Sequence, residues 1–393
     1  MAYLSHLSLT NFRNLVELEL DLPEGVVVFS GPNAQGKTAF LEAVYLLAIA
    51  RSFRAENERE VLNFQAAAQG EQGLVSGTVE KKGERVQVIV GYEPVETRRN
   101  GGGLTGDPRP GAVSVRKQIR VSRVRRTATE LVGTVNAVLF SADDIELVMG
   151  PPSGRRRFLD VLISQADPLY IKGLQRYQKV VQQRNQLLRM INDGRANAEE
   201  LAFWDDELVR EGAWITWRRR EVMKELARDC AEHHSQLASP GEDFQVAYQP
   251  SVPLGESMHD TEDRFRQSLA AASRRERATA STVVGPHRDD FDLLINEVDM
   301  GTFASRGQAR TLGLSLRLAE ASYLASVRGE GPIVLLDDVL SEMDGERRRR
   351  VLEKATQYQQ TLITTTDIEP MKEFFGQAAT YFRVADGGVQ RWQ

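Results

Sequence analysis

The segment from residue 26 to residue 50 constrains the fold of this chain more than any other. It begins with an almost uninterrupted apolar run at 26–30, continues through the loop GPNAQGKT at 31–38, and ends in a stretch of helical composition at 37–50. An apolar run without alternation is typical of a strand buried on both faces of a sheet. A strand, a G-x-x-x-x-G-K-T loop and a helix, in this order, predict the phosphate-binding loop of a nucleotide-binding α/β fold.

Such a loop binds phosphate through its backbone. Its N–H groups point at phosphate oxygens, and the following helix adds the partial positive charge of its N-terminus. Lys37 is expected to reach the β- and γ-phosphates of ATP, and the Thr38 hydroxyl to ligate Mg²⁺. The loop residues expected to contact the nucleotide are Gly31, Pro32, Asn33, Ala34, Gln35, Gly36, Lys37 and Thr38. A chance glycine-rich turn is disfavoured by the flanking strand and helix.

A second apolar run, 333–336, ends in two acids, Asp337 and Asp338. The carboxyl edge of a parallel sheet is where nucleotides bind in α/β folds. We expect Asp337 to hold Mg²⁺ and Asp338 to polarise the attacking water as general base, with Asp338 and Lys37 as catalytic residues. The alternative is a solvated strand end, which the presence of a phosphate-binding loop in the same chain disfavours.

Composition limits the class of protein. The formal net charge is −5 and there is one cysteine, Cys230. A single thiol forms no internal disulfide, which favours a reducing compartment. Neither a secretion leader nor an apolar run of membrane-spanning length is visible, so we expect a cytoplasmic protein without a membrane partner. On an acidic chain, contact with DNA requires a local basic patch.

The order of elements predicts an ATPase head that is split in the sequence. Strand-like segments at 3–9, 15–21, 74–79 and 85–91 surround the phosphate-binding loop, whereas 155–188 and 203–237 have helical period. We expect an α/β head with its N-terminal half at 1–145, including a β-rich subdomain at about 74–126. An inserted, mainly helical lobe is expected at 146–281, and the C-terminal half of the head at 282–393.

The string ASRGQAR at 304–310 precedes another helix, with Ser305 as a good N-cap and Gly307 leaving the helix terminus open. It resembles the signature of ABC-type ATPases, and SEMD at 341–344 resembles their D-loop. The resemblance implies that Ser305, Gly307 and Gln308 of one copy close on the γ-phosphate bound by another, giving an ATP-dependent homodimer in which Ser305 assists catalysis. A plain capped core helix is the alternative.

Further strings resemble the RecF family within this superfamily, in the family's order and over nearly the whole chain. They are LSLTNFRN at 7–14, LEAVYLL at 41–47, FSADD at 140–144, GRRRFLD at 154–160, GPHRDDF at 285–291 and VLLDDVLSEMD at 334–344. The resemblance implies a weak, DNA-stimulated ATPase that acts as a switch in recombinational repair and replication restart. It also implies binding to single- and double-stranded DNA at gaps and junctions, partnership with RecR and RecO in loading RecA, and support of the SOS response.

The resemblance also assigns residues, and the chain departs from the superfamily pattern in places. Arg13, within the first string, is expected to contact the nucleotide. Transporter subunits carry a switch histidine where this chain has TTT at 364–366, so Thr365 or Thr366 is expected near the γ-phosphate. Ala34 replaces a glycine common in the family, and we expect its methyl group to be tolerated if φ is negative.

A basic segment is the candidate DNA contact. Residues 98–126 contain nine arginines and lysines against one acid, Asp107. Arginine-rich strands and loops suit phosphate contacts without base readout. The residues expected to bind DNA are Arg116, Lys117, Arg120, Arg123, Arg125 and Arg126, with Arg98, Arg99 and Arg109 in the same patch and 155–157 as a second candidate. A solvated hairpin is the alternative.

Three alternatives to the RecF assignment remain. An SMC-like ATPase would need sustained heptads for a long coiled coil, which the insertion lacks. A transporter subunit would carry the switch histidine, and a nuclease-coupled ATPase would carry a further metal-dependent domain. His287 and Arg288 could be structural, holding the insertion against the head, or could have a direct role in DNA or nucleotide coupling. His233 and His234 are expected on a solvated helix face.

Overall fold

The predicted strand, loop and helix are present, and the strand and the helix lie in the hydrophobic core. β3 (Gly25–Ser30) is followed by the loop and then by α1 (Lys37–Ile49). The computed structural model describes residues 2–95, 114–238, 240–341 and 343–392. These divide into one unit of residues 1–142 with 324–393 and a second unit of residues 143–323.

The first unit has two six-stranded sheets within its described residues. One is antiparallel, in the order β2 (Leu15–Asp21), β1 (Ala2–Phe12), β4 (Gly73–Lys81), β5 (Glu84–Val95), β6 (Ser114–Val121), β7 (Val124–Arg126). The other is parallel except for its edge strand, in the order β15 (Gly388–Arg391), β14 (Ala379–Ala385), β3, β13 (Gln360–Thr365), β12 (Ile333–Asp337), β8 (Ala137–Ser141). The expected α/β head, split in the sequence, is confirmed.

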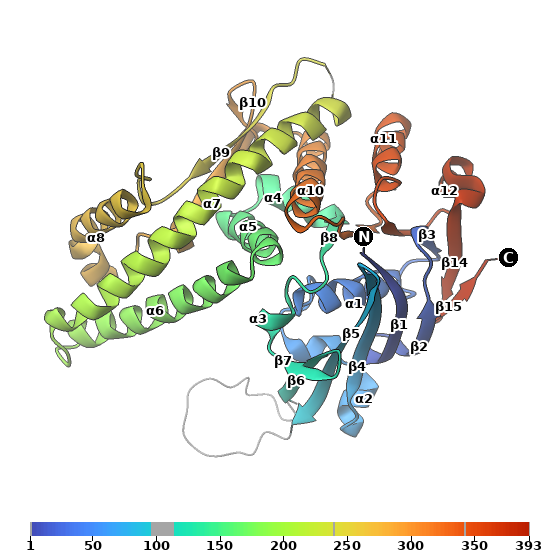
Figure 1. Ribbon diagram of the computed structural model, residues 1–393, viewed down its shortest axis with the longest axis horizontal. Helices are drawn as coiled ribbons and strands as arrows, with labels where there is room; N and C mark the ends of the chain where they lie inside the picture. Colours follow the sequence, from blue (N-terminus) through green and yellow to red (C-terminus); the bar gives the residue numbers. More distant parts are fainter. Residues whose placement is uncertain (1, 96–113, 239, 342, 393) are drawn as a thin grey trace. The chain divides into compact units, whose positions relative to one another are not determined.

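Helix α1 lies between the two sheets and contacts strands of both (Figure 1). Its apolar side chains, from Ala39 to Ala48, are buried around the whole helix. A helix that is apolar on every face is stable only when it is enclosed, and here the two sheets enclose it. The shorter helices of this unit are α2 (Phe64–Gln69), α3 (Ala128–Leu131), α11 (Gly345–Ala355) and α12 (Glu369–Phe375).

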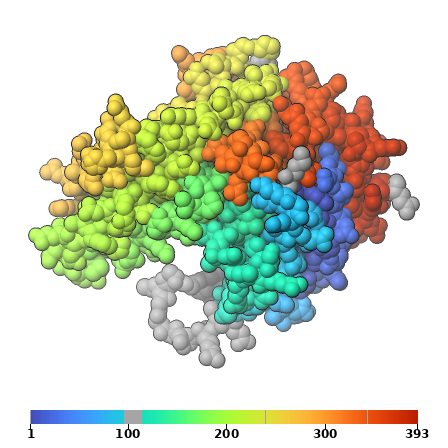
Figure 2. All heavy atoms as spheres, in the orientation of Figure 1, coloured from blue at the N-terminus to red at the C-terminus, as the bar shows by residue number. Residues whose placement is uncertain are grey.

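The parallel sheet brings the two ends of the chain together. β3 pairs with β13 at one edge and with β14 at the other. Its consecutive residues Val26, Val27, Val28 and Phe29 are all buried, so both faces of the strand are covered. The blue N-terminal and red C-terminal atoms consequently meet on one surface in Figure 2. The carboxyl ends of β3 and β12 lie at the same edge of this sheet, with β13 between them.

The second unit combines long helices with a small sheet. Its helices are α4 (Ile145–Met149), α5 (Pro152–Ala166), α6 (Pro168–Asn192), α7 (Leu201–Leu237), α8 (Met258–Thr279), α9 (Met300–Phe303) and α10 (Arg306–Arg328) to residue 323. The helical stretch expected at 155–188 is two helices, because Asp167 caps α6 through the Leu169 N–H and Pro168 occupies its first turn.

The strand order of the small sheet is β11 (Val298–Asp299), β10 (Asp290–Ile295), β9 (Phe244–Gln249). β10 pairs over its whole length with β9, which lies in the segment expected to be helical insertion. Residues 282–323 therefore group with the second unit, whereas the sequence division placed them in the C-terminal half of the head. Long-range strand pairing of this kind leaves no local trace in the sequence.

Candidate nucleotide-binding site

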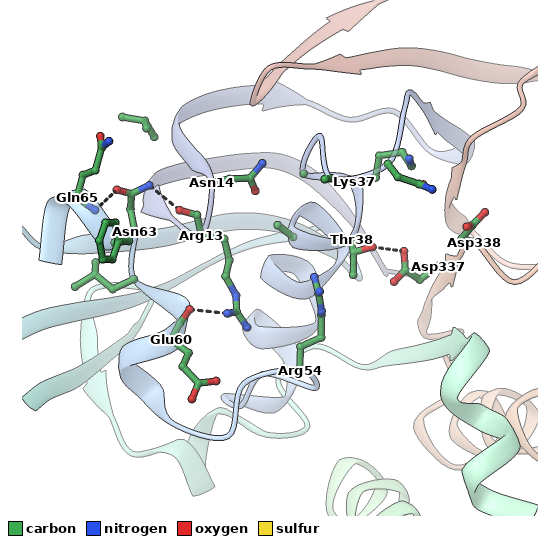
Figure 3. A pocket seen from close by; sticks show the side chains of 17 residues that line it. Arg13, Asn14, Lys37, Thr38, Arg54, Glu60, Asn63, Gln65, Asp337 and Asp338 are labelled. Carbon is green, nitrogen blue, oxygen red and sulfur yellow. Dashed lines mark hydrogen bonds between the residues drawn. The ribbon is translucent and has the colours of Figure 1, made fainter. Parts of the chain in front are cut away.

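An open cavity of about 860 Å³ lies over the phosphate-binding loop, within the first unit (Figure 3). This volume is in the range of small-molecule sites. Of the predicted residues, Arg13, Asn33, Ala34, Gly36, Lys37, Thr38, Asp337 and Asp338 line it. Gly31, Pro32, Gln35 and Thr365 are not among its lining residues, and Ser305, Gly307 and Gln308 belong to the second unit.

The loop keeps its shape through glycine geometry at two positions. Gly36 has φ 109°, and a Cβ at Gly31 would lie 2.1 Å from the Val384 carbonyl oxygen. Ala34 also has positive φ, at 66°. The condition under which its methyl group was expected to be tolerated is therefore not met, and Ala34 holds a left-handed conformation that glycine adopts more easily.

Lys37 is fixed against the loop. Its ammonium group donates to the carbonyl oxygens of Gly31 at 2.6 Å and Pro32 at 2.8 Å. Burial lowers the pKa of Lys37, while the nearby carboxylates of Asp338 and Asp337 oppose that shift. The cation thus lies between the loop carbonyls and the acid pair, where a polyphosphate would bind.

The metal-ligand candidates come together as expected. The Thr38 hydroxyl donates to Asp337 Oδ1 at 3.0 Å (Figure 3). Burial raises the pKa of Asp337, and hydrogen bonds from Thr364 and Thr38 act in the opposite direction. A hydroxyl and a carboxylate at this spacing are oxygen donors of the type that Mg²⁺ prefers, so these residues fit the ion.

Asp338 differs from Asp337 in its backbone and its partners. It follows the end of β12 with φ 50°. Its Oδ1 atom is buried and has no hydrogen-bond partner among the described residues. A buried carboxylate oxygen without a partner is costly, and it is suited to accept a hydrogen bond from a water or a ligand. The general-base role of Asp338 stays a prediction.

Arg13 lines the cavity, but its guanidinium is held by other groups. It donates to both carboxylate oxygens of Glu42, at 3.0 and 2.6 Å, and to the Glu60 carbonyl at 2.6 Å. Glu42 is fully buried in α1 and also accepts from Ser52. Arg13 therefore joins α1 to the segment that follows it, and its expected contact with nucleotide stays a prediction.

Sequence reasoning missed one wall of the cavity. Arg54, Leu62, Asn63, Phe64 and Gln65 line it, together with Asn14 and Val16. Phe64 is 85% exposed, although aromatic side chains are usually at least partly buried. The segment 51–65 has no periodicity in the sequence, so only a search for isolated Arg and Phe near the loop could have suggested it.

Thr365 is not placed as the sequence suggested. Its hydroxyl donates to the Asp367 carbonyl at 2.8 Å and accepts the Asp367 N–H, which closes a local turn. Thr366 is exposed. The hydroxyl that contacts the acid pair is that of the preceding residue, Thr364, at 2.8 Å from Asp337 Oδ1.

In the second unit, Ser305 precedes α10 as an N-cap. Gln308 N–H donates to the Ser305 hydroxyl at 3.2 Å, and Ser305 N–H donates to Gln308 Oε1 at 3.1 Å. This reciprocal pair is a capping box. Ser305 and Gly307 are exposed, so the N-terminus of a 23-residue helix is open to an anionic partner.

The basic residues of β6 and β7 divide between two faces. By strand alternation, Arg116 and Arg120 lie on one face of β6 and Lys117 lies on the other. Arg125 lies opposite Arg120 in the register. Arg116, Arg120 and Arg125 are exposed on one face, and Arg123 is exposed in the turn. Arg98, Arg99 and Arg109 lie outside the described residues.

Three members of this patch have other partners, and Arg125 donates to Gln118 Oε1 at 3.0 Å. Lys117 donates to the Ala50 carbonyl at 2.8 Å and pairs with Glu58. Arg126 lies opposite Ile119 and forms a 3.5 Å ion pair with Glu130. Lys117 is half-buried and therefore less available for DNA than the exposed arginines, which include Arg126.

Asp289, within the GPHRDD string, is the centre of a buried junction of the second unit. Asp289 accepts from the fully buried Arg219 at 3.0 Å and from Tyr248, and Arg219 also bonds Asp160 at 2.8 Å. A Cβ at Gly285 would lie 2.3 Å from the Tyr177 hydroxyl.

Two other groups of sequence-predicted residues also have internal partners. In the second DNA candidate, Arg155 forms a two-bond ion pair with Asp290 and Arg156 donates to the Asp289 carbonyl at 2.9 Å.

The prediction that His233 and His234 lie on a solvated helix face is wrong. His234 is fully buried between Ser315 and Glu242, because α7 packs on β9.

His287 is also part of the packing. Its Nδ1 is 2.6 Å from the Tyr177 hydroxyl and its Nε2 is 3.0 Å from the Thr282 carbonyl. A carbonyl only accepts, so Nε2 carries the proton and Nδ1 accepts from Tyr177. Burial lowers the pKa of His287. Both contacts are made by the neutral ring.

Comparison with known proteins agrees with this geometry. The family model of the RecF/RecN/SMC N terminal domain matches residues 3–387. The DNA replication and repair protein RecF of Herpetosiphon aurantiacus is 39% identical, and the alignment covers 98% of each chain. The chain belongs to the RecF family.

Two further RecF comparisons span the whole family fold. RecF of Streptococcus gordonii is 35% identical over 99% of this chain and 100% of its own. A solved structure of the recombination mediator protein RecF with ATP, in the RecFOR pathway, has a TM-score of 0.86 at 31% identity and covers 100% of this chain and 98% of its own. The Smc head domain of Pyrococcus furiosus, at 14% identity and a TM-score of 0.52, shares the fold.

No helix in the described residues is long and apolar enough to cross a membrane.

Proposed function

We propose that this chain is an ATP-binding DNA replication and repair protein that hydrolyses ATP slowly and uses the nucleotide as a switch on DNA. The observation that carries the proposal is the convergence of Lys37, Thr38 and Asp337 at one cavity, from two segments of the chain about 300 residues apart. RecF relatives at 35–39% identity and a solved RecF structure with ATP support it.

The residues divide the reaction between binding and hydrolysis. The loop N–H groups and Lys37 bind the triphosphate, and Thr38 and Asp337 would hold Mg²⁺. When bound, Mg²⁺ neutralises charge that develops on the phosphate oxygens. Asp338 would orient the attacking water and accept its proton.

An ATP-dependent homodimer completes the switch. The open N-terminus of α10, with Ser305, Gly307 and Gln308, would bind the γ-phosphate held by the loop of a second copy. Two anion sites that share one phosphate lose their common ligand when that phosphate leaves, so hydrolysis would release the dimer.

The exposed arginines of β6 and β7 would contact the DNA backbone without reading its sequence. Gapped or junction DNA, with both single- and double-stranded segments, is the proposed substrate. RecR and RecO are the proposed partners in loading RecA and supporting the SOS response, in keeping with the RecFOR pathway of the solved relative. The proposed location is the cytoplasm.

Hydrolysis measured with and without gapped duplex DNA tests this function. We expect slow turnover that gapped DNA stimulates. Turnover that is independent of DNA would favour a transporter-like ATPase, which shares the nucleotide site but has no use for DNA.

A further inference from the structure

Thr364 connects the two acids of the nucleotide site. Its hydroxyl donates to Asp337 Oδ1 at 2.8 Å and accepts the Asp338 backbone N–H at 3.1 Å. The Thr364 carbonyl also lies 3.3 Å from the Asp338 N–H. The side chain is almost fully buried on β13, directly opposite Asp337 in the parallel register.

These contacts fix both the carboxylate and the backbone of the acid pair. Asp337 Oδ1 accepts two hydroxyl bonds, from Thr38 at the start of α1 and from Thr364 on the adjacent strand. Asp338 has φ 50°, a conformation that a non-glycine residue holds only when neighbouring groups stabilise it. The Thr364 hydroxyl and carbonyl supply that stabilisation at the Asp338 N–H.

We propose that Thr364 is a positioning residue for ATP hydrolysis. It orients Asp337 toward Mg²⁺ and sets the backbone turn that directs Asp338 at the attacking water. The inference rests on the proposed ATPase function and adds to it a residue that does not line the cavity. Replacing the hydroxyl by a methyl group removes one donor and one acceptor from the acid pair while keeping nearly the same side-chain shape.

The same strand offers a matched control. Thr361 is also fully buried on β13, and its hydroxyl donates to the Ala355 carbonyl at 2.8 Å, away from the acids. Thr361→Val therefore removes a buried hydroxyl from the same strand without altering the acid pair. Thr364→Ser keeps the hydroxyl and is the conservative rescue.

The experiment measures a fluorescent ATP analogue binding across a Mg²⁺ titration and in EDTA, single-turnover hydrolysis, and the thermal midpoint of each full-length variant. For Thr364→Val we expect parent-like binding in EDTA and a Mg²⁺ half-point about tenfold higher, since bonds to a charged group carry about that much. Hydrolysis should fall at least as far, with KM less affected. Thr364→Ser should stay close to the parent, and Thr361→Val should lower only the thermal midpoint.

The outcomes separate the inference from the function on which it rests. A Thr364→Val protein with the parent's Mg²⁺ dependence and hydrolysis, alongside an inactive Asp338→Asn protein, would overturn the role of Thr364 alone. Equal losses in Thr364→Val and Thr361→Val would also overturn it, because they would indicate general destabilisation. A parent chain that neither binds the analogue with Mg²⁺ nor hydrolyses ATP would overturn both. Thr364→Ala replaces the valine variant if that variant does not fold.

Discussion

Thr38 and Asp337 are joined by a 3.0 Å hydrogen bond although 299 positions separate them in the sequence. Thr38 follows β3 and Asp337 ends β12, and β13 lies between these two strands in the parallel sheet. The sheet order therefore assembles the site. β3 and β12 end at the same edge, so the helix that follows β3 and the end of β12 present a hydroxyl and a carboxylate to one cavity.

Removal of the Lys37 cation should weaken nucleotide binding. Lys37→Ala loses a charge-assisted contact to phosphate, which is expected to cost about 1.5–3 kcal/mol, or roughly 10- to 150-fold in affinity. Equilibrium titration with a fluorescent ATP analogue measures this. Arg349→Ala, on the exposed face of α11, is the control for loss of one cation. Equal affinity in parent and Lys37→Ala would contradict the placement of the phosphates.

The exposed arginines of the β6–β7 hairpin should control the salt dependence of DNA binding. Arg123→Ala with Arg125→Ala removes two phosphate contacts, so the slope of log affinity against log salt should decrease by about 1.8. Fluorescence anisotropy with gapped duplex DNA at several salt concentrations gives this slope.

A matched double variant exists in the same sheet. Lys82 and Arg85 lie at the β4–β5 turn, and Lys82 has positive φ as Arg123 does. Replacing both by alanine should leave the slope at the parent's value. Equal changes of slope in the two double variants would show that DNA binding responds to the overall charge of the sheet. The hairpin would then not be the DNA contact.

His287 should make the protein less stable in acid. Because burial lowers its pKa, the folded chain binds a proton there less readily than the unfolded chain, whose histidine titrates near 6.5. Its contribution to stability is therefore complete above about pH 6.5 and falls as the pH decreases below that value. Urea unfolding at pH 7.5 and 5.5 should show a larger loss in the parent than in His287→Gln. A loss of the same size in both would contradict this assignment.

Local patterns in the sequence were sufficient for the elements of the site but not for all of its walls. The apolar run before the loop predicted β3, and the apolar run that ends in Asp337 and Asp338 predicted β12, because a strand buried on both faces has no polar alternation. Arg54 and Phe64 could not be predicted, since they lie in an aperiodic segment that only the tertiary fold brings to the cavity.

Other differences between the sequence-based predictions and the structure also arise from tertiary contacts. Lys117 and Arg120 have similar local sequence, yet strand alternation turns Lys117 toward Glu58 and leaves Arg120 exposed. His234 is polar and lies in a polar helix, yet β9 and α10 residues bury it. Thr364 differs from its neighbour Thr365 only in the face of β13 on which it lies, and that face decides which hydroxyl reaches the acids.

The central claim is that one triphosphate is bound between the Lys37 loop of one copy and the Ser305 helix of another. Sedimentation velocity of the full chain with a slowly hydrolysed ATP analogue, and separately with ADP, measures it most directly. We expect a dimer with the analogue and a monomer with ADP. Ser305→Arg should be monomeric in both, because its side chain would block the open end of α10. A Ser305→Arg protein that dimerises with the analogue as the parent does, or a parent that stays monomeric in both nucleotides, would contradict it.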